Sequence, residues 1–273
     1  MIKKIFIEDE FSTLKTVILG DYRPYTLSTK KPQQINIDKQ VLNDIEKVLI
    51  SCNVNVIKPK YNKILNISQS MWVRDSSVVI DNSHILLKGG SRGRKTEFKT
   101  INFNKSILFP YEENNNIRLE GGDIIQCKDI VFVGINKRTN ILGYEWLVNN
   151  FRKKKIIPIY HDLLHLDCGF NILSNNFILY SKKYIKNIPE YCREKFKFVN
   201  IDKLINVNFD TNLATNFLSI NPKTIIISNQ LKFKLLRKYL EELGYNLILI
   251  DTKNIHNQSG SIRCLTCPLY RLN

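Results

Sequence analysis

The 273-residue sequence predicts an α/β fold in which about five strand–strand–helix–strand units close into a ring, an α/β propeller. Two observations lead to this prediction: one hairpin pattern recurs at a nearly constant spacing, and helical windows separate the hairpins. No linker rich in proline, glycine or serine divides the chain. Residues 1–273 are therefore expected to form a single catalytic domain of about five internal repeats.

The repeated hairpin consists of an apolar strand, a short polar turn and a second apolar strand. It occurs four times, as SVVIDNSHILLK, DIIQCKDIVFVG, FNILSNNFILYS and FLSINPKTIIIS. The turns centre near Asn82, Lys128, Asn175 and Pro222, which lie 46 or 47 residues apart. Such a regular period indicates that one supersecondary unit is repeated along the chain.

Helices are predicted between the hairpins, most clearly over Thr139–Phe151 and Leu231–Leu243, where apolar residues recur at spacings of three and four. A short apolar strand follows each, KIIPIY in one case and NLILI in the other. A first unit is predicted from LKTVILG, a helix within Asp38–Cys52 and the strand NVNVIKP. The repeats at the ends do not look like capping repeats, so a closed ring is preferred to an open solenoid.

Polar residues stand at corresponding places in the repeat, immediately before the hairpins. They are Asp75 in WVRDSS, Glu120 in RLEGGD, and His165 and Asp167 in HLDCGF, and Cys264 in SIRCLTC follows about two periods later. In a closed ring, residues at equivalent positions gather near the axis. A cysteine nucleophile needs a proton acceptor, and the acceptor needs an orienting group. The shared phase therefore favours a catalytic site over a lone buried cysteine and a structural histidine.

Several carboxylates around one small site suit a cationic substrate, and a planar guanidinium can pair with two carboxylates through forked hydrogen bonds. Charge matching therefore points to a guanidine. Asp123, which ends LEGGD, is a further candidate acid. Arg138 in NKRTN and Arg92 or Arg94 in GGSRGRK could bind the other end of such a substrate.

The net charge of +16 raises the question of a nucleic-acid or membrane partner. The basic residues are dispersed, and the densest run, Arg152–Lys155, ends a predicted helix, where cations favour the helix dipole. The sequence has no apolar run of about 18 residues and no signal-like start, so a cytoplasmic protein is expected. Neither nucleic acid nor membrane is expected as a partner, and the six scattered cysteines are expected to be reduced.

Taken in order, the segments WVRD, LEGGD, KRTN, HLDCGF and GSIRCLTCPLYR resemble the guanidino-group-modifying superfamily. This superfamily comprises arginine deiminases, dimethylarginine dimethylaminohydrolases and amidinotransferases. The resemblance extends from about Leu14 to Arg271, and FSTLKTVILG is similar to the family's first strand. It implies a pentein fold, a five-bladed α/β propeller, in agreement with the repeat.

The resemblance also implies roles for the in-phase residues, that is, the polar residues at corresponding places in the repeat. Cys264 would attack the guanidinium carbon and form a covalent amidino-thioether. His165 would protonate the departing amine and later activate the incoming nucleophile, and Glu120 would orient His165 or hold the guanidinium.

The remaining candidates are assigned to substrate binding. Asp75 and Asp167 match the carboxylates that clamp the guanidinium in arginine deiminase-like members, and Asp123 is grouped with them. Arg138 and Arg94 would bind the substrate carboxylate. The resemblance implies a small guanidino substrate and neither a metal nor an organic cofactor.

Within the superfamily, the short chain and KRTN resemble the compact dimethylarginine hydrolases, but these often lack the aspartate of HLD, so an arginine deiminase-like pocket is preferred to one for methylated substrates. Hydrolysis of arginine or a close relative is therefore expected. The alternative is an amidinotransferase, which TNILGYEWL, FNIL and CLTCPLYR resemble, although such enzymes are usually longer and often carry aspartate where Glu120 stands. The sequence leaves this choice, the substrate and the oligomeric state open.

Two readings from other classes are weighed. A zinc protein would use Cys264, Cys267, His165 and Cys168 as ligands, although only one Cys-x-x-Cys is present. A non-catalytic binding protein could keep the same propeller. Because Cys267 does not keep step with the repeat, it is expected to be a packing residue, so that Cys267→Ala stays active.

Overall fold

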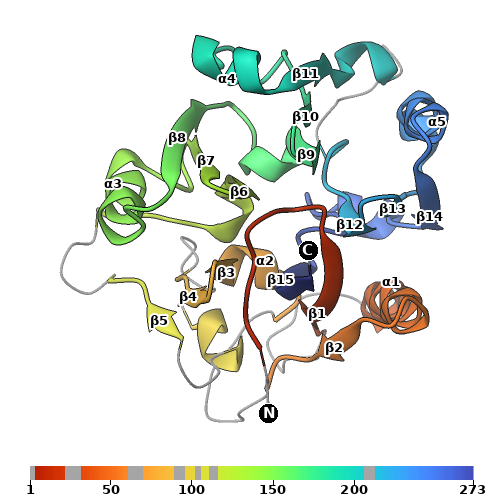
Figure 1. Cartoon of the computed structure of the whole chain (residues 1–273). Coiled ribbons are helices and arrows are strands. Elements are labelled where there is room, and N and C mark those ends of the chain that lie inside the picture. Colours follow the sequence, from red (N-terminus) through yellow and green to blue (C-terminus); the bar gives the residue numbers. More distant parts are fainter. Residues whose placement is uncertain are drawn as a thin grey trace.

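The computed structural model describes residues 4–21, 32–60, 70–88, 96–101, 106–110, 116–205 and 213–272, with backbone alone at 32–37. In these ranges the strands form five three-stranded sheets arranged around a central axis (Figure 1). The longer helices lie on the outer rim of the ring, and one strand of each blade lies nearest the axis. The predicted five-bladed α/β propeller is confirmed.

Four blades share one design: an antiparallel hairpin whose second strand pairs in parallel with a third, outer strand. The second blade is β3 (Ser77–Ile80), β4 (Ser83–Leu86) and β5 (Ile107–Leu108), and the third is β6 (Ile124–Cys127), β7 (Ile130–Ile135) and β8 (Lys155–Tyr160). The fourth is β9 (Phe170–Ser174), β10 (Phe177–Tyr180) and β11 (Lys197–Asn200), and the fifth is β12 (Leu218–Asn221), β13 (Thr224–Ser228) and β14 (Asn246–Ile250). All four predicted hairpins are present.

The first blade differs from the predicted unit because its inner strand comes from the far end of the chain. β15 (Thr266–Leu272) pairs antiparallel with β1 (Thr13–Leu19), which pairs in parallel with β2 (Asn55–Ile57). One sheet therefore joins the beginning and the end of the chain and closes the ring. The strand that closes it begins two residues after Cys264.

The outer helices include the two predicted from period-3.6 apolar patterns, within Thr139–Phe151 and Leu231–Leu243. The outer helices are α1 (Pro32–Ser51), α3 (Ile141–Asn150), α4 (Glu190–Lys195) and α5 (Lys234–Glu242), with short α6 (Lys253–His256) before the last strand. The side chain of Asn140 accepts a hydrogen bond from Gly143 N, which caps α3 and explains why it begins at Ile141. Leu236 and Leu240 of α5 belong to the buried cluster of the fifth blade, where each contributes about 1.5–3 kcal/mol.

Short helical turns precede three of the inner strands. They are α2 (Val73–Ser76), the 3-10 turn η2 (Gly121–Asp123) and the 3-10 turn η3 (Leu166–Cys168). Two further 3-10 segments, η1 (Glu97–Ile101) and η4 (Ile201–Leu204), lie elsewhere on the ring, and η5 (Leu231–Phe233) leads into α5. The turn η2 contacts both α2 and η3, so the ends of successive inner strands converge at one end of the axis.

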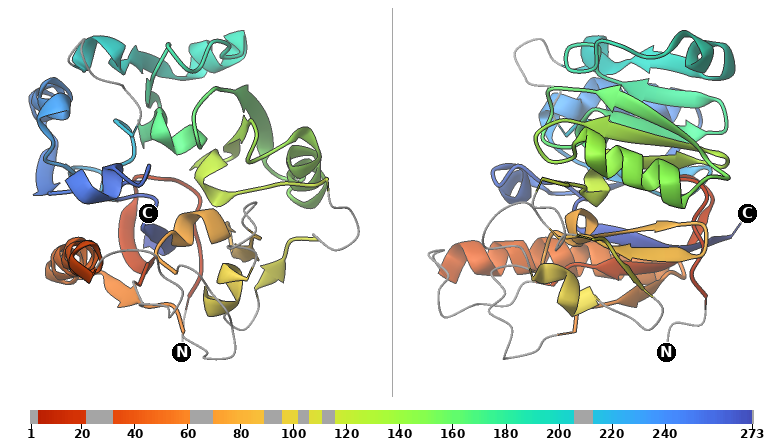
Figure 2. Two further views of the ribbon diagram at one scale, coloured as in Figure 1. Left: turned by 180° about the vertical axis from the view of Figure 1, so that it is seen from behind. Right: turned by 90° about the vertical axis from the view of Figure 1, so that its left-hand side faces the viewer.

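The N-terminal segment before β1 runs across the ring (Figures 1 and 2). Ile7 forms a β-bridge with Asp81 of the second blade, and Asp9 forms one with Cys127 of the third. The segment therefore connects the first blade, which it enters at β1, to the second and third blades. In the described part of the chain, no helix has the length and apolar character needed to cross a membrane.

Candidate active site

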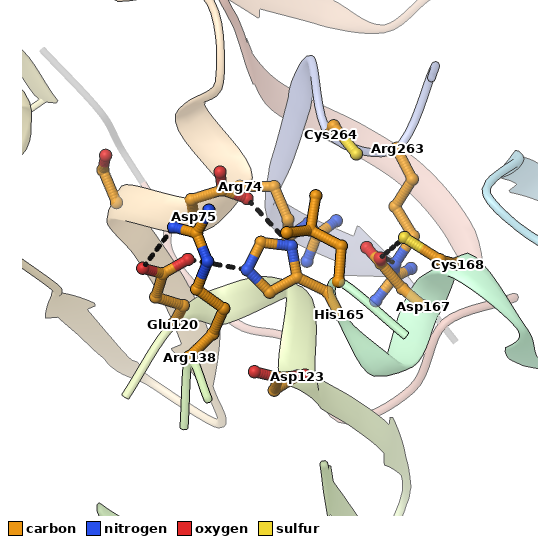
Figure 3. A network of polar contacts seen from close by, with 12 residues as sticks. Arg74, Asp75, Glu120, Asp123, Arg138, His165, Asp167, Cys168, Arg263 and Cys264 are labelled. Atoms are coloured by element: carbon orange, nitrogen blue, oxygen red, sulfur yellow. Dashed lines mark hydrogen bonds and ion pairs between the residues drawn. The ribbon is translucent and has the colours of Figure 1, made fainter. Parts of the chain in front are cut away.

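The five in-phase residues lie close to one another at the axis, and all of them are buried (Figure 3). Asp75 comes from α2, Glu120 and His165 immediately precede η2 and η3, and Asp167 lies within η3. Cys264 stands in the turn before β15 and is 4% exposed. In Figure 3, Glu120 and Asp75 lie on one side of His165, and Asp167 and Cys264 lie on the other.

His165 is held between two carboxylates. Its Nε2 donates to Glu120 Oε2 at 2.6 Å, and its Nδ1 lies 3.6 Å from Asp75 Oδ1. Burial alone would lower the pKa of His165, but Asp75, the hydrogen bond to Glu120 and the charge of Asp123 outweigh it and raise the pKa to about 10. The imidazole is therefore a cation at neutral pH and can donate a proton.

A glycine makes the approach of these blades possible. A Cβ built at Gly122 would lie only 2.7 Å from the ring of His165, so any larger residue would push the histidine away from Glu120. The pair Gly121-Gly122 in LEGGD is thus required for close packing of the third blade against its neighbours.

Arg138 lies at the rim, where its Nη1 donates to Glu120 Oε1 at 3.3 Å. Its side chain is 32% exposed and also lines a cavity of about 600 Å³. The other lining residues are Asn136, Lys137, His161, Asp162, Leu163 and Leu164. Arg138 therefore lies between this cavity and the carboxylate of Glu120.

The sulfur of Cys264 lies in a polar setting that the sequence did not predict. Asn216 Nδ2 donates to Cys264 Sγ at 3.3 Å and to Asp167 Oδ1 at 3.0 Å. Burial raises the pKa of the Cys264 thiol, and the charges of Asp167 and Asp75 raise it further. The thiol is therefore protonated at neutral pH in the unliganded protein.

Asp167 is paired within the chain. Arg263 Nε donates to Asp167 Oδ2 at 3.1 Å, and Arg263 Nη1 donates to Glu10 Oε2 at 2.6 Å. Burial opposes the charge of Arg263, but Glu10 and Asp167 raise its pKa above the ordinary value. Burial alone would raise the pKa of Glu10, but Arg263 lowers it to about 2. This buried triad connects the N-terminal segment to the turn that carries Cys264.

The oxygens of Asp123 are also occupied. Oδ1 accepts from Leu166 N at 2.8 Å and lies 3.1 Å from His161 Nε2, and Oδ2 accepts from Thr139 Oγ1 at 2.7 Å. These bonds fix the backbone immediately after His165. Asp123 thus lies near the site without turning a free oxygen toward it, and Arg94, predicted beside Arg138, lies outside the described residues.

Cys267 lies in a different environment from Cys264: its sulfur accepts from Ser77 Oγ at 3.3 Å, between the first and second blades. The four ligands of the zinc alternative are therefore not brought together. Among the described residues, one histidine–acid group has metal-ligand spacing, Asp75, Glu120 and His165, whose nearest ligand atoms lie within 4.8 Å of one another. These three could hold a metal ion between them.

A family profile described as arginine deiminase matches residues 94–198 and 193–271. An uncharacterized protein, YkgA of Bacillus subtilis (strain 168), is 29% identical over 98% of this chain and 96% of its own length. The dimethylarginine dimethylaminohydrolase of Pseudomonas aeruginosa is 22% identical, covering 72% of this chain and 75% of the relative.

Solved structures show the same fold. SxtG, an amidinotransferase from Microseira wollei, superimposes with a TM-score of 0.80 over 98% of both chains at 17% identity. The P. aeruginosa hydrolase in complex with citrulline has a TM-score of 0.76 at 18% identity, covering 94% of this chain and all of that chain. The chain therefore belongs to the arginine deiminase family of guanidino-group-modifying enzymes, which have the pentein fold.

Proposed function

We propose that the protein hydrolyses the guanidino group of arginine or an arginine-like substrate through a covalent intermediate on Cys264. The observation that best supports this is the charged His165 between Glu120 and Asp75, beside a buried thiol. Such a group can protonate a leaving amine, which is the difficult step in breaking a C–N bond of a guanidinium.

The charge balance of the site supports a cationic substrate. Asp75 and Asp167 raise the pKa of the Cys264 thiol in the free protein. A guanidinium bound against Asp75 and Glu120 would offset the negative field, so the thiol would lose its proton to solvent as the substrate enters. The nucleophile would then form only when the substrate is present, and the empty site would be protected from oxidation.

In the proposed reaction, the Cys264 thiolate adds to the guanidinium carbon, and the bond from this carbon to a terminal nitrogen breaks as His165 gives that nitrogen a proton. Ammonia leaves, and an amidino-thioether that still carries the rest of the substrate remains on the sulfur. Neutral His165 then takes a proton from water, and hydroxide adds to the same carbon. The C–S bond breaks to release a ureido product, and the proton of the added hydroxyl passes to the departing sulfur. His165 is again a cation, and Cys264 is again free.

Arg138 has a proposed second role. In the free protein it pairs with Glu120, yet it is partly exposed and lines the adjoining cavity. As the guanidinium approaches Glu120, Arg138 would release that carboxylate and pair with the substrate's own carboxylate. Asp123 and Asp167, whose oxygens have partners within the chain, are assigned positioning roles.

The alternative is amidino transfer, which the resemblance of CLTCPLYR and TNILGYEWL to amidinotransferases supports. A different bond would then break: the bond to the side-chain nitrogen, so that ornithine leaves and a bare amidino group remains on Cys264. An amine acceptor, in place of water, would then attack the amidino carbon and take the amidino group from Cys264.

The test is to incubate the protein with arginine, alone and with glycine, lysine or ornithine, and to measure citrulline, ornithine, ammonia and new guanidino products. Citrulline and ammonia in equal amounts without an acceptor support hydrolysis. Ornithine that appears only with an acceptor, together with a new guanidino compound, would refute it in favour of transfer. Dimethylarginine serves as a second substrate, and Cys264→Ser is the inactive control.

A further inference from the structure

We propose that Asn216 is a catalytic residue whose side-chain amide donates a hydrogen bond to the sulfur of Cys264 and stabilises the thiolate. Its part in turnover rests on the proposed function, in which Cys264 is the nucleophile. Asn216 lies in the turn before β12, in the one unit of the repeat that lacks an in-phase acid, histidine or cysteine.

The orientation of the Asn216 amide is fixed by backbone contacts. Its Oδ1 accepts from the backbone N–H of Arg263 at 3.0 Å and of Cys264 at 3.3 Å. A carbonyl oxygen is required opposite two N–H donors, so the Nδ2 end must face Cys264 Sγ and Asp167. Because Asn216 is 2% exposed, water does not compete for these positions.

The same amide can serve both protonation states of the thiol. In the neutral state, the Cys264 S–H can donate to Asn216 Oδ1 at 3.5 Å. In the thiolate state, Nδ2 donates to the sulfur from 3.3 Å. No movement of the side chain is needed when the proton leaves, which is the condition for a preorganised donor.

The surrounding charges explain why such a donor is needed. Asp75 of α2 and Asp167 of η3 both oppose a negative sulfur, and neutral Cys168 of η3 lies in the same electrostatic environment. The guanidinium of Arg263 forms ion pairs with Glu10 and Asp167. In the described ranges, Asn216 supplies the side-chain donor to Cys264, and the backbone of Ser261 adds a second favourable contact.

The turn that carries Asn216 is held in place by other residues. Asn171 Nδ2 donates to Thr215 O at 2.8 Å and to Phe217 O at 3.4 Å, and Thr215 Oγ1 donates to Asp167 O at 3.0 Å. Asn171 is as buried as Asn216. A variant at Asn171 therefore loosens the turn without removing the donor, and it is the matched control for Asn216.

The test compares Asn216→Asp, Asn216→Ala, Asn216→Ser and Asn171→Ala in the full chain. The readout is the rate at which iodoacetamide alkylates Cys264 between about pH 7 and pH 10, followed by mass spectrometry of the Cys264 peptide. Asn216→Asp keeps the shape and the acceptor but replaces the donor with an anion. It is expected to slow alkylation at least about tenfold, which corresponds to a pKa rise of one unit.

Asn216→Ala is expected to slow alkylation less, and Asn216→Ser, which keeps a hydroxyl donor, to recover part of the rate. Asn171→Ala is expected to lower the melting temperature while alkylation stays within about threefold of wild type. Wild-type alkylation rates in a folded Asn216→Asp protein would overturn the proposal. Equal slowing in Asn171→Ala would also overturn it, because the position of the turn would then be the cause.

Alkylation requires no substrate, so this result is separable from the proposed function. If wild type forms no product from arginine and Asn216→Asp still slows alkylation, the proposed function fails while the donor role of Asn216 stands. If wild type converts arginine and Asn216→Asp is alkylated and turns over at wild-type rates, the inference about Asn216 alone fails.

Discussion

Two arginines of the site, Arg138 and Arg263, pair with carboxylates in contrasting ways. The side chain of Arg138 is 32% exposed and pairs with Glu120 at 3.3 Å. Arg263 is 1% exposed and bridges Glu10 and Asp167 at 2.6 Å and 3.1 Å. A rim pair can be exchanged for a substrate, whereas a buried triad cannot open without leaving charges unpaired. We therefore propose Glu120, rather than Asp167, as the carboxylate that accepts a substrate guanidinium.

The same contrast separates the two cysteines of the final segment. Cys264 lies beside Asn216 and the charges of the site, while Cys267 faces Ser77 between two blades.

We expect Cys264→Ser to reduce kcat/KM for arginine by at least about 10³-fold, because a serine hydroxyl is a far weaker nucleophile here. Cys267→Ala should remain within about threefold of wild type. Steady-state citrulline assays with circular dichroism as a folding control would check both; loss of activity in folded Cys267→Ala would reverse the assignment of the nucleophile.

Removing the buried arginine should mainly affect stability. Arg263→Met leaves Glu10 and Asp167 buried without their cation, at an expected cost of about 3–5 kcal/mol in the free energy of unfolding. Arg138→Met, the matched rim variant, should cost less than about 1 kcal/mol. Urea unfolding of both variants measures the difference. Equal losses in the free energy of unfolding would contradict the distinction between an exchangeable pair at the rim and a buried triad.

Removing the rim arginine should mainly affect substrate selection. Arg138→Gln is expected to raise KM for arginine by about 10–100-fold, because a charge-assisted contact to the substrate carboxylate is lost. Agmatine, which has the guanidine but no carboxylate, should be affected by less than about threefold. Side-by-side kinetics on the two substrates test this. An equal rise in KM for arginine and agmatine would show that Arg138 does not recognise the substrate carboxylate.

The charge on His165 should make stability depend on pH. Its pKa is raised to about 10 from an ordinary value of 6.5, so the folded state holds a proton that the unfolded state loses first. This stabilisation is complete below about pH 6.5 and is lost as the pH rises through about 10, by at most about 1.4 kcal/mol per pH unit. Urea titrations should therefore show the gap between wild type and His165→Gln narrowing from about pH 7 to about pH 9.5. A constant gap would show that His165 is not held as a cation.

Much of the fold could be predicted because each blade repeats the same local chemistry. The turns near Asn82, Lys128, Asn175 and Pro222 lie within the hairpins that form. The pairing of β1 with β15 could not be predicted in this way, because antiparallel partners some 250 residues apart leave no local pattern. For the same reason, the crossing of the ring by the segment containing Glu10 was not anticipated.

The candidate residues that keep the phase of the repeat, Asp75, Glu120, His165 and Cys264, lie together at the axis as expected, and their roles stay predictions. Asn216 was missed because it stands two positions after the in-phase residue Ala214 and reaches the axis through a turn in which Leu213 has a φ of +70°. Arg263 adjoins Cys264, but its adjacency did not reveal that it points toward Asp167. Conversely, Asp123 follows an in-phase acid closely, yet its oxygens face His161 and Thr139.

The most direct test of the proposed chemistry is to trap the intermediate. Wild-type protein is mixed with arginine, quenched in acid during turnover and digested, and the Cys264 peptide is weighed by mass spectrometry. The proposed hydrolysis predicts a peptide that is heavier by the mass of arginine less ammonia, at Cys264 and at no other cysteine. A peptide carrying only an amidino group would indicate transfer. Turnover without any adduct on Cys264, or with one on another cysteine, would contradict the account.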